Sequence, residues 1–184
     1  MPSAGGLSIV IAFSIATLVF IPMLTSTTAP IKSYLSYTLP VVGAGWIIAL
    51  TGLIDDVKEL SAKKKMIGIL LAASLVWFLT DFRLNDFKIP FGGPLLHFEP
   101  WLSYLLTVIW IVAITNAVNL IDGLDGLVSG VSIISLVTMG IVSYFFLPVP
   151  NLFLTMTIFV LVASIAGFFP FNYHPAILYL GDTG

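Results

Sequence analysis

The chain has 184 residues and contains no cysteine and few charged side chains. Without cysteine, it has neither disulfide bonds nor thiolate-bound metal sites. Charged residues make up only 9% of the chain, and the formal net charge of −2 comes without the basic run that binds nucleic acid. We therefore expect no nucleic-acid partner. Any chemistry must rest on a small number of carboxylates, amides and lysines.

Apolar residues are abundant instead. They form 59% of the chain, the mean hydropathy is +1.11, and several runs approach the roughly 20 residues with which a helix crosses a bilayer. We expect an all-α, polytopic integral membrane protein with about six transmembrane helices, forming a single domain over residues 1–184. The expected helices cover residues 7–24, 38–54, 64–80, 101–121, 127–147 and 152–171.

The loops between these helices alternate across the bilayer. Residues 1–6, 55–63, 122–126 and 172–184 fall on one side, and residues 25–37, 81–100 and 148–151 fall on the other. Counted to the start of the third helix, the first side collects most of the charged residues, namely Asp55, Asp56, Glu59, Asp122, Asp125 and Asp182 with Lys58, Lys63, Lys64 and Lys65. The lysines cluster beside helix ends, which assigns this side to the cytoplasm by the positive-inside rule.

Four polar residues recur every third position at the end of an apolar run. Asn116, Asn119, Asp122 and Asp125 lie about one turn apart if the helix continues. Such a stripe is typical of a phosphate or metal site, and carboxylate oxygens are preferred ligands of Mg²⁺. The alternative is that both aspartates are turn residues in a glycine-rich loop.

Other polar residues on the same side admit two readings each. One of Asp55 and Asp56 could take a proton from an incoming nucleophile, while the other holds a metal ion or orients the nucleophile. The alternative is that both are solvated residues at a helix end. Lys63, Lys64 and Lys65 are typical of a membrane anchor, although Lys65, nearest the helix, is the best placed to meet a phosphate. Considered by itself, His174 is more typical of a hydrogen-bonded interface residue than of a catalyst. Asp182, in Gly-Asp-Thr-Gly, is by itself more typical of a turn. On the other side, Gly92 and Gly93 predict a structural hairpin within residues 87–98.

Taken together, these motifs resemble the polyprenyl-phosphate N-acetylhexosamine-1-phosphate transferases, integral membrane enzymes of bacterial cell-envelope glycan assembly. The resemblance rests on motifs in the family's order, namely Met1 to Leu7, Gly52 to Asp56, Leu60 to Lys65, Asn116 to Leu127, Phe171 to Ala176 and Gly181 to Gly184. It implies Mg²⁺-dependent transfer of a sugar-1-phosphate from a UDP-sugar to a polyprenyl phosphate, with release of UMP.

The resemblance also implies roles for individual residues. The catalytic residues would be Asp55, Asp56, Asp122 and Asp182, with Asp122 and Asp182 as metal ligands, and the substrate-binding residues would be Lys65, Asn116, Asn119, Asp125 and His174. The stretch His174-Pro175-Ala176 and Thr183 are more similar to the branch that uses UDP-N-acetylglucosamine and undecaprenyl phosphate. We expect these two substrates and the cell membrane as partners, an active face in the cytoplasm, and a homodimer as an open alternative to a monomer.

Several alternatives remain. Within the family, the muramoyl-pentapeptide branch is the second choice. A CDP-alcohol phosphotransferase would need an Ala-Arg pair soon after Asp-Gly, which Leu124 to Leu127 lacks. A divalent-cation transporter would carry its acids within the spans. Members of the family usually have ten or eleven helices and a histidine-rich loop beyond the Gly-Asp-x-Gly motif. We therefore expect the chain to be the middle portion of a longer enzyme, truncated at both ends. An isolated middle portion is expected to be an inactive membrane fragment.

Overall fold

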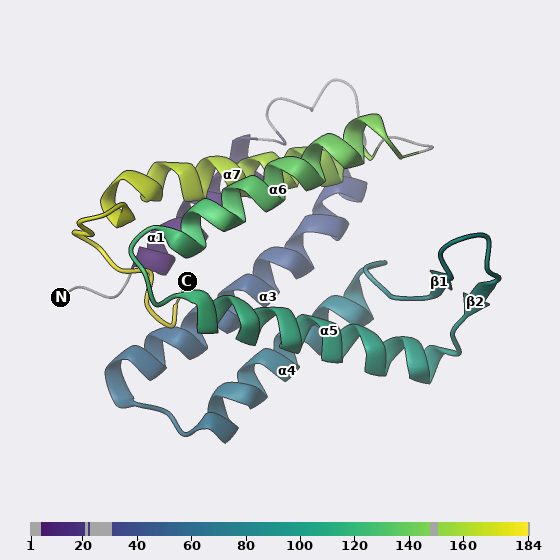
Figure 1. Ribbon diagram of the computed structural model, residues 1–184, viewed down its shortest axis with the longest axis horizontal. Helices are drawn as coiled ribbons and strands as arrows, with labels where there is room; N and C mark the ends of the chain where they lie inside the picture. Colours follow the sequence, from purple (N-terminus) through teal and green to yellow (C-terminus); the bar gives the residue numbers. More distant parts are fainter. Residues whose placement is uncertain (1–4, 21, 23–30, 148–150, 184) are drawn as a thin grey trace.

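The computed structural model describes residues 5–20, 22, 31–147 and 151–183. This part of the chain is mostly helical (Figure 1). Its elements are α1 (Gly5–Ile15), the π-helical turn η1 (Ala16–Phe20), α3 (Ile31–Lys58), α4 (Ala62–Leu79), β1 (Asp86–Lys88), β2 (Leu95–His97), α5 (Pro100–Ile121), α6 (Leu127–Phe145) and α7 (Leu152–Asn172). The expected all-α class needs one correction, because a β-hairpin joins α4 to α5. That hairpin lies where Gly92 and Gly93 predicted it.

Each predicted helical segment coincides with a helix, but the ends differ. The start of α3 is Ile31 rather than residue 38, so Pro40 lies inside this helix. Pro170 lies inside α7 in the same way. A proline removes one helical hydrogen bond, which neighbouring helices and hydroxyl side chains compensate in membranes. Pro100 lies in the first turn of α5, where a proline is tolerated. Residues 21, 23 and 24 of the first predicted helix lie outside the described residues.

Four of the six expected spans are supported by the length and composition of their helices. Four helices are long and apolar enough to cross a membrane, namely Tyr34–Lys58 within α3, and α5, α6 and α7. The 18 residues of α4 include three lysines in its first turn, and the apolar helix at Gly5–Val19 is shorter than a span. Among the described residues, length and composition thus support four spans, and the other two of the six expected spans are not confirmed.

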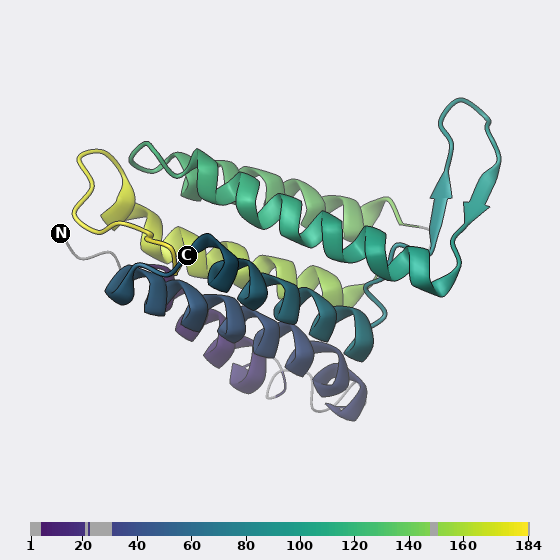
Figure 2. The same ribbon diagram turned by 90° about the horizontal axis from the view of Figure 1, so that it is seen from below.

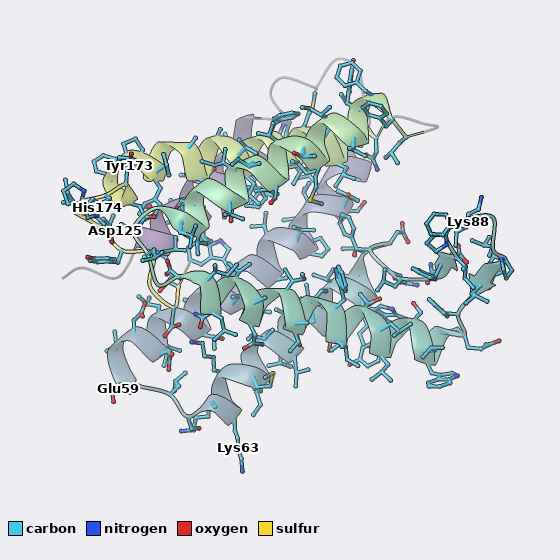
Figure 3. All side chains as sticks on the ribbon, in the orientation of Figure 1. Glu59, Lys63, Lys88, Asp125, Tyr173 and His174 are labelled. Carbon is cyan, nitrogen blue, oxygen red and sulfur yellow. The ribbon has the colours of Figure 1, made fainter. Side chains whose placement is uncertain are left out.

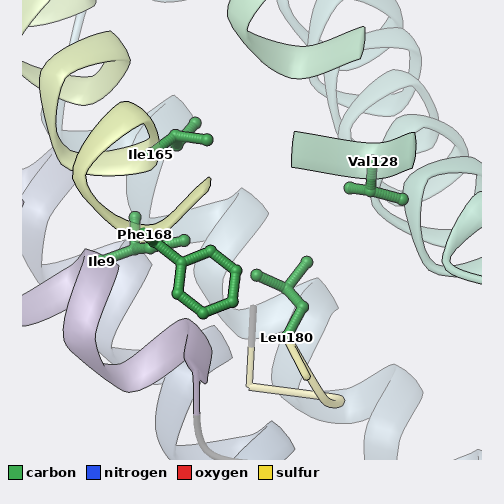
Figure 4. Close-up of a cluster of buried hydrophobic side chains, with 5 residues drawn as sticks. All are labelled: Ile9, Val128, Ile165, Phe168 and Leu180. Carbon is green, nitrogen blue, oxygen red and sulfur yellow. The ribbon is translucent and has the colours of Figure 1, made fainter. Parts of the chain in front are cut away.

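The helices pack as neighbouring pairs. α6 packs along α7, α3 along α4, α4 along α5, and α1 along α7. A small buried cluster joins three of these helices to the C-terminal segment, and it consists of Ile9, Val128, Ile165, Phe168 and Leu180 (Figure 4). Many large apolar side chains remain on the outside of the bundle, as expected where lipid replaces water around the spans.

One end of the bundle gathers segments that are distant in sequence. The end of α3, the start of α4, the end of α5, the start of α6 and the end of α7 lie together, and the hairpin lies at the opposite end (Figures 1 and 2). Backbone bonds attach the start of α1 there, since the amides of Gly5 and Gly6 donate to the carbonyls of Tyr179 and Leu180. We call residues 55–65, 119–126 and 172–183 the acidic end.

Candidate functional site

The acidic end brings together the loops that the alternating topology predicted to share one side. Figure 3 shows Glu59, Lys63, Asp125 and His174 at this end and Lys88 at the other. Hydrogen bonds described below connect residues 55–65 with residue 182, and residue 125 with residues 174–176. The predicted grouping of these loops is therefore confirmed within the described residues.

Asp55 closes the turn between α3 and α4. One carboxylate oxygen, Oδ1, accepts a hydrogen bond from the backbone amide of Leu60 at 2.6 Å, and the other, Oδ2, lies 3.1 Å from Nζ of Lys65. The turn itself requires a left-handed residue, which is Glu59 with a φ of 46°. The carboxylate of Asp55 thus fixes the turn and at the same time orients Lys65.

Lys65 is the lysine of its cluster that turns toward the carboxylates. Its Nζ donates to Oδ1 of Asp182 at 2.6 Å as well as to Asp55. Lys63 and Lys64 are exposed, which agrees with the anchoring reading for those two. Lys65 was the lysine that the sequence predicted to be best placed to meet a phosphate, and it is the one that contacts the carboxylates. The structure does not test its role in binding.

Asp182 is the point at which three helices and the C-terminal segment meet. Besides Lys65 on α4, the amide Nδ2 of Asn119 on α5 donates to its Oδ1 at 2.7 Å. Burial alone would raise the pKa of Asp182, but the interactions with the side chains of Lys65, Asp55 and Asn119 together outweigh burial and lower that pKa. Asp182 is thus held in its ionised form.

Asp56 holds the backbone around Asp182 in place. Its Oδ1 accepts from the amide of Asp182 at 3.1 Å, and its Oδ2 accepts from the hydroxyl of Thr183 at 2.8 Å. The segment lies so close to α3 that a Cβ on Gly52 would come within 1.9 Å of the carbonyl oxygen of Asp182. In this structure, Asp56 therefore positions its neighbours, and both of its oxygens are occupied.

Asp122 differs from the other carboxylates at this end. It caps the C-terminus of α5 and is exposed, and its carboxylate makes no hydrogen bond with any residue in the described ranges. Although the residue as a whole is exposed, partial desolvation of its carboxylate is the larger of two effects that raise the pKa of Asp122, and the negative charge of Asp182 is the other. Two neighbouring carboxylates thus have pKa values shifted in opposite directions, a pattern that is typical of acid–base and metal-binding sites.

Asp125 and His174 form a separate contact. Oδ2 of Asp125 lies 3.0 Å from Nδ1 of His174 and accepts from the backbone amide of Ala176 at 3.1 Å. These bonds lower the pKa of Asp125, the amide of Ala176 having the larger effect. Among the described residues, neither side chain bonds to the group around Asp182. The structure therefore places this pair beside the other predicted site residues and not within their hydrogen-bond network.

Asn116 lines a small cavity next to Asp182. Its Nδ2 donates to the carbonyl of Val112 one turn earlier. The cavity has a volume of about 30 Å³ and is lined by Ile48, Thr51, Gly52, Lys65, Ile69, Thr115, Asn116, Asn119 and Asp182. That volume is enough for about one water molecule, so larger ligands would bind at its mouth.

Comparison with known proteins assigns the chain to a family. Residues 38–184 match the model of glycosyl transferase family 4. The chain belongs to glycosyl transferase family 4. It is 39% identical, over its whole length, to the probable undecaprenyl-phosphate N-acetylglucosaminyl 1-phosphate transferase of Bacillus subtilis, of which it covers 47%. It is also 37% identical to the phospho-N-acetylmuramoyl-pentapeptide-transferase of Staphylococcus saprophyticus and 30% identical to that of Oceanobacillus iheyensis, covering 57% and 56% of these proteins.

This family 4 chain therefore spans about half the length of the curated relatives it matches. The resemblance inferred from the motifs is confirmed at the level of the family. The matched region begins within α3 and includes the whole network around Asp182, whereas α1 precedes it. Met1 to Ala4 and Gly184, which contributed to the resemblance, lie outside the described residues.

Sequence reasoning missed three residues of this family 4 site. Thr183 appeared only as a variant of a motif, but its hydroxyl bonds to Asp56. Asn172 and Ser129 are buried and bonded to each other, and Asn172 also donates to the carbonyl of Leu178, so they hold the loop that leads to Asp182. An asparagine at the end of the apolar helix α7 was the signal that could have indicated this role.

Proposed function

We propose that this chain forms part of the active site of a phosphoglycosyltransferase. The enzyme would transfer N-acetylglucosamine-1-phosphate from UDP-N-acetylglucosamine to undecaprenyl phosphate and release UMP. The observation that carries the proposal is the network in which Lys65, Asn119 and Asp55 converge with Asp182 at one end of a membrane bundle. Carboxylates beside a lysine and an amide, at the end of spans and not within them, suit phosphate chemistry at a membrane surface better than ion transport through it.

The reaction requires two anionic phosphates to meet. An oxygen of the lipid phosphate forms a bond to the phosphorus that carries the sugar, and the bond from that phosphorus to the oxygen of UMP breaks. Negative charge then grows on UMP, and a preorganised cation stabilises it. Lys65 is suited to this role because Asp55 and Asp182 orient it beside the cavity mouth.

Proton removal from the lipid phosphate falls to a carboxylate that accepts protons readily. Asp122 suits this task because its oxygens accept no hydrogen bond from the described residues, which leaves one oxygen available to the proton when the other holds a cation. Asp55 and Asp56 were the sequence-based choice for it. Their oxygens already accept bonds from Leu60, Lys65, Asp182 and Thr183, so we propose that they position the site while Asp122 and Asp182 act on the substrates.

Mg²⁺ is the cofactor that the proposal includes. Within the described ranges, no three acidic or histidine residues lie close enough to hold a metal ion by themselves. Mg²⁺ commonly uses one or two carboxylates together with substrate phosphates and water, and Asp122 with Asp182 fits such a set. Their mutual repulsion, visible in the raised pKa of Asp122, is what a bound cation would relieve. When bound, Mg²⁺ would neutralise phosphate charge.

The proposed orientation places the acidic end in the cytoplasm, where nucleotide sugars are made. Lys58, Lys63 and Lys64 support this orientation, since all three are exposed at the acidic end and lysines are more frequent in cytoplasmic loops. The active protein would then be a multi-pass protein of the cell membrane, with UDP-sugar and polyprenyl phosphate meeting at its inner surface.

The experiment is a UMP-release assay on a protein that carries this chain, purified in detergent and supplied with UDP-N-acetylglucosamine and undecaprenyl phosphate. We expect UMP only with Mg²⁺, and a loss of about 100-fold or more in kcat for Asp122→Asn, in the range seen when a charge-stabilising group is removed. The matched control is Asp86→Asn at the opposite end, which should leave kcat unchanged. Equal turnover of Asp122→Asn at matched expression would contradict the assignment.

The same assay decides between branches of the family. Because some relatives are phospho-N-acetylmuramoyl-pentapeptide-transferases, UDP-N-acetylmuramoyl-pentapeptide is the alternative sugar donor. UMP release from UDP-N-acetylmuramoyl-pentapeptide, without release from UDP-N-acetylglucosamine, would move the protein to that branch. We expect the opposite preference, which the greater identity to the Bacillus subtilis relative supports.

A further inference from the structure

The β-hairpin at the end opposite the site has one apolar face that no described residue covers. Its strands pair Phe87 with Leu96 and Asp86 with His97. Directly paired side chains share a face, and successive side chains alternate between faces. Phe87, Leu96 and, two residues along the strand, Ile89 therefore lie on one face. All three are exposed, with Phe87 at 52%.

The other face of the hairpin is mostly polar. Asp86 and His97 contact each other there through Oδ1 and Nδ1, and Lys88 lies opposite Leu95 on the same face. At the tip, Phe91 has a left-handed backbone with a φ of 62° and is fully exposed. The hairpin is thus amphipathic, with an aromatic ring at its far point.

Such a hairpin is poorly stable in water by itself. A two-stranded ribbon is marginal unless it packs on another surface, and each strand here has only three residues. Large exposed apolar patches commonly mark interaction sites for proteins or membranes. Something outside the described residues is therefore expected to cover Phe87, Ile89 and Phe91.

Position indicates that the covering surface is lipid. The hairpin runs directly into α5, a candidate span whose exposed face begins at Trp101 and continues through Leu105 and Ile109. Figure 2 shows the teal hairpin projecting sideways from the bundle, across the direction of the helices. If α5 crosses the bilayer along its length, a segment that projects in this way runs along the bilayer surface. Nearby, the guanidinium of Arg83 lies 4.7 Å from the ring centre of Trp77, and such aromatic and cationic residues are frequent at membrane interfaces.

Charge does not explain binding to the membrane here. Between Asp86 and His97 the hairpin carries one aspartate, one lysine and one histidine, so it has no excess of basic residues. Anionic lipid attracts clusters of lysine and arginine, and this hairpin has none. Its contact with lipid would depend on apolar and aromatic side chains.

We propose that the hairpin is an interfacial anchor, whose apolar face and Phe91 insert into the bilayer surface on the side opposite the acidic end. The occupant of the face is phospholipid at the level between headgroups and acyl chains. The anchor holds the start of α5, and with it Asn119 at the far end of the same helix, at a fixed height relative to the bilayer.

The test uses the absence of cysteine, because a single introduced thiol can be labelled selectively. Phe91→Cys and Lys88→Cys each receive a nitroxide label, and the full chain is reconstituted into phosphatidylcholine vesicles. Electron paramagnetic resonance then measures relaxation of the label by oxygen, which concentrates in lipid, and by a nickel chelate, which stays in water. We expect oxygen to dominate at position 91 and the nickel chelate to dominate at position 88.

Two results at position 91 would overturn the proposal. Relaxation by the nickel chelate equal to that at position 88 would place the tip in water. Protection from both reagents would mean that protein covers it, either another segment or a second copy. Vesicles that also contain phosphatidylglycerol should give the same values, and deeper insertion only with this anionic lipid would contradict an uncharged anchor. Unchanged thermal unfolding of both labelled variants checks that the fold is kept.

Discussion

Nζ of Lys65 lies 2.6 Å from Oδ1 of Asp182, a residue 117 positions further along the chain. This contact joins the start of α4 to the last described segment, and Asn119 adds the end of α5. A substrate phosphate that binds Lys65 would therefore contact a cation whose position depends on three separate parts of the chain. Changes that move Asp182 should disturb the site even when they lie outside it.

Gly52→Ala should displace the segment around Asp182. The new Cβ would overlap the carbonyl oxygen of Asp182, which belongs to the backbone and cannot rotate away. Overpacking of this kind costs about 1–3 kcal/mol, so we expect a lower temperature of unfolding in detergent. The matched control on the same helix is Gly45→Ala, where nothing lies within 4 Å of the added methyl group. That variant should be neutral or more stable by up to about 1 kcal/mol, and equal losses in both variants would contradict the close approach.

The bond between Asp56 and Thr183 should appear as a coupling energy. Thr183→Val removes the hydroxyl that donates to Asp56 at 2.8 Å, and a hydrogen bond to a charged group contributes about 1.5–3 kcal/mol. A double-mutant cycle with Asp56→Ala, measured by titration with a denaturing detergent, should give a coupling of at least about 1 kcal/mol. Thr138→Val is the control, because the hydroxyl of Thr138 bonds within its own helix. Strict additivity of Thr183→Val and Asp56→Ala would rule out the bond.

Asp182→Asn should lower the pKa of Asp122. Burial and the negative charge of Asp182 together raise that pKa, and the substitution removes the charge while keeping the shape. The pKa of Asp122 then moves toward its ordinary value of 3.8. At any pH in the titration range, a smaller fraction of Asp122 is therefore protonated in the variant. Carbon-13 NMR of the aspartate carboxyl groups measures the shift, and Asp86→Asn at the other end should leave it unchanged. An unaltered titration after Asp182→Asn would show that the two groups do not interact.

The contact between Asp125 and Ala176 should weaken in acid. The pKa of Asp125 is lowered chiefly by the amide of Ala176. A lowered pKa means that the contact stabilises the loop above the ordinary value of 3.8 and that this stability is lost as the pH falls through the lower, folded value. The amide proton of Ala176 should therefore titrate in NMR spectra with a midpoint below 3.8. Asp125→Asn should abolish this titration, and its persistence in the variant would assign it to another group.

The helices were predictable because their apolar runs are long, whereas their ends were not. The apolar run from residue 38 predicted a helix start there, yet α3 begins at Ile31 and continues through Pro40. Lys63 to Lys65 begin a helix that is apolar enough elsewhere to resemble a span. Local composition cannot show how neighbouring helices compensate for a proline, because that depends on packing.

The grouping of the site was predictable because loops on one side of a membrane must lie near one another. Individual contacts were not. Asp55 and Asp56 are adjacent and chemically identical, but one faces Leu60 and Lys65 while the other faces Thr183. Asp125 shares the spacing of Asn119 and Asp122, yet the chain leaves the helix at Asp122, so Asp125 turns toward His174. Residues three positions apart lie on one face only as long as the helix continues.

The dependence of Lys65 on Asp182 also has a consequence for biosynthesis. A chain is made from its N-terminus and folds in that order as it leaves the ribosome. Asp55, Lys65 and Asn119 are therefore inserted well before Asp182 is translated, so for that interval Lys65 has Asp55 but not Asp182 as its counter-ion. The network that we propose for phosphate chemistry can close only after residue 182 has emerged, and a nascent chain halted just before that point could have α3, α5 and α6 inserted without this network.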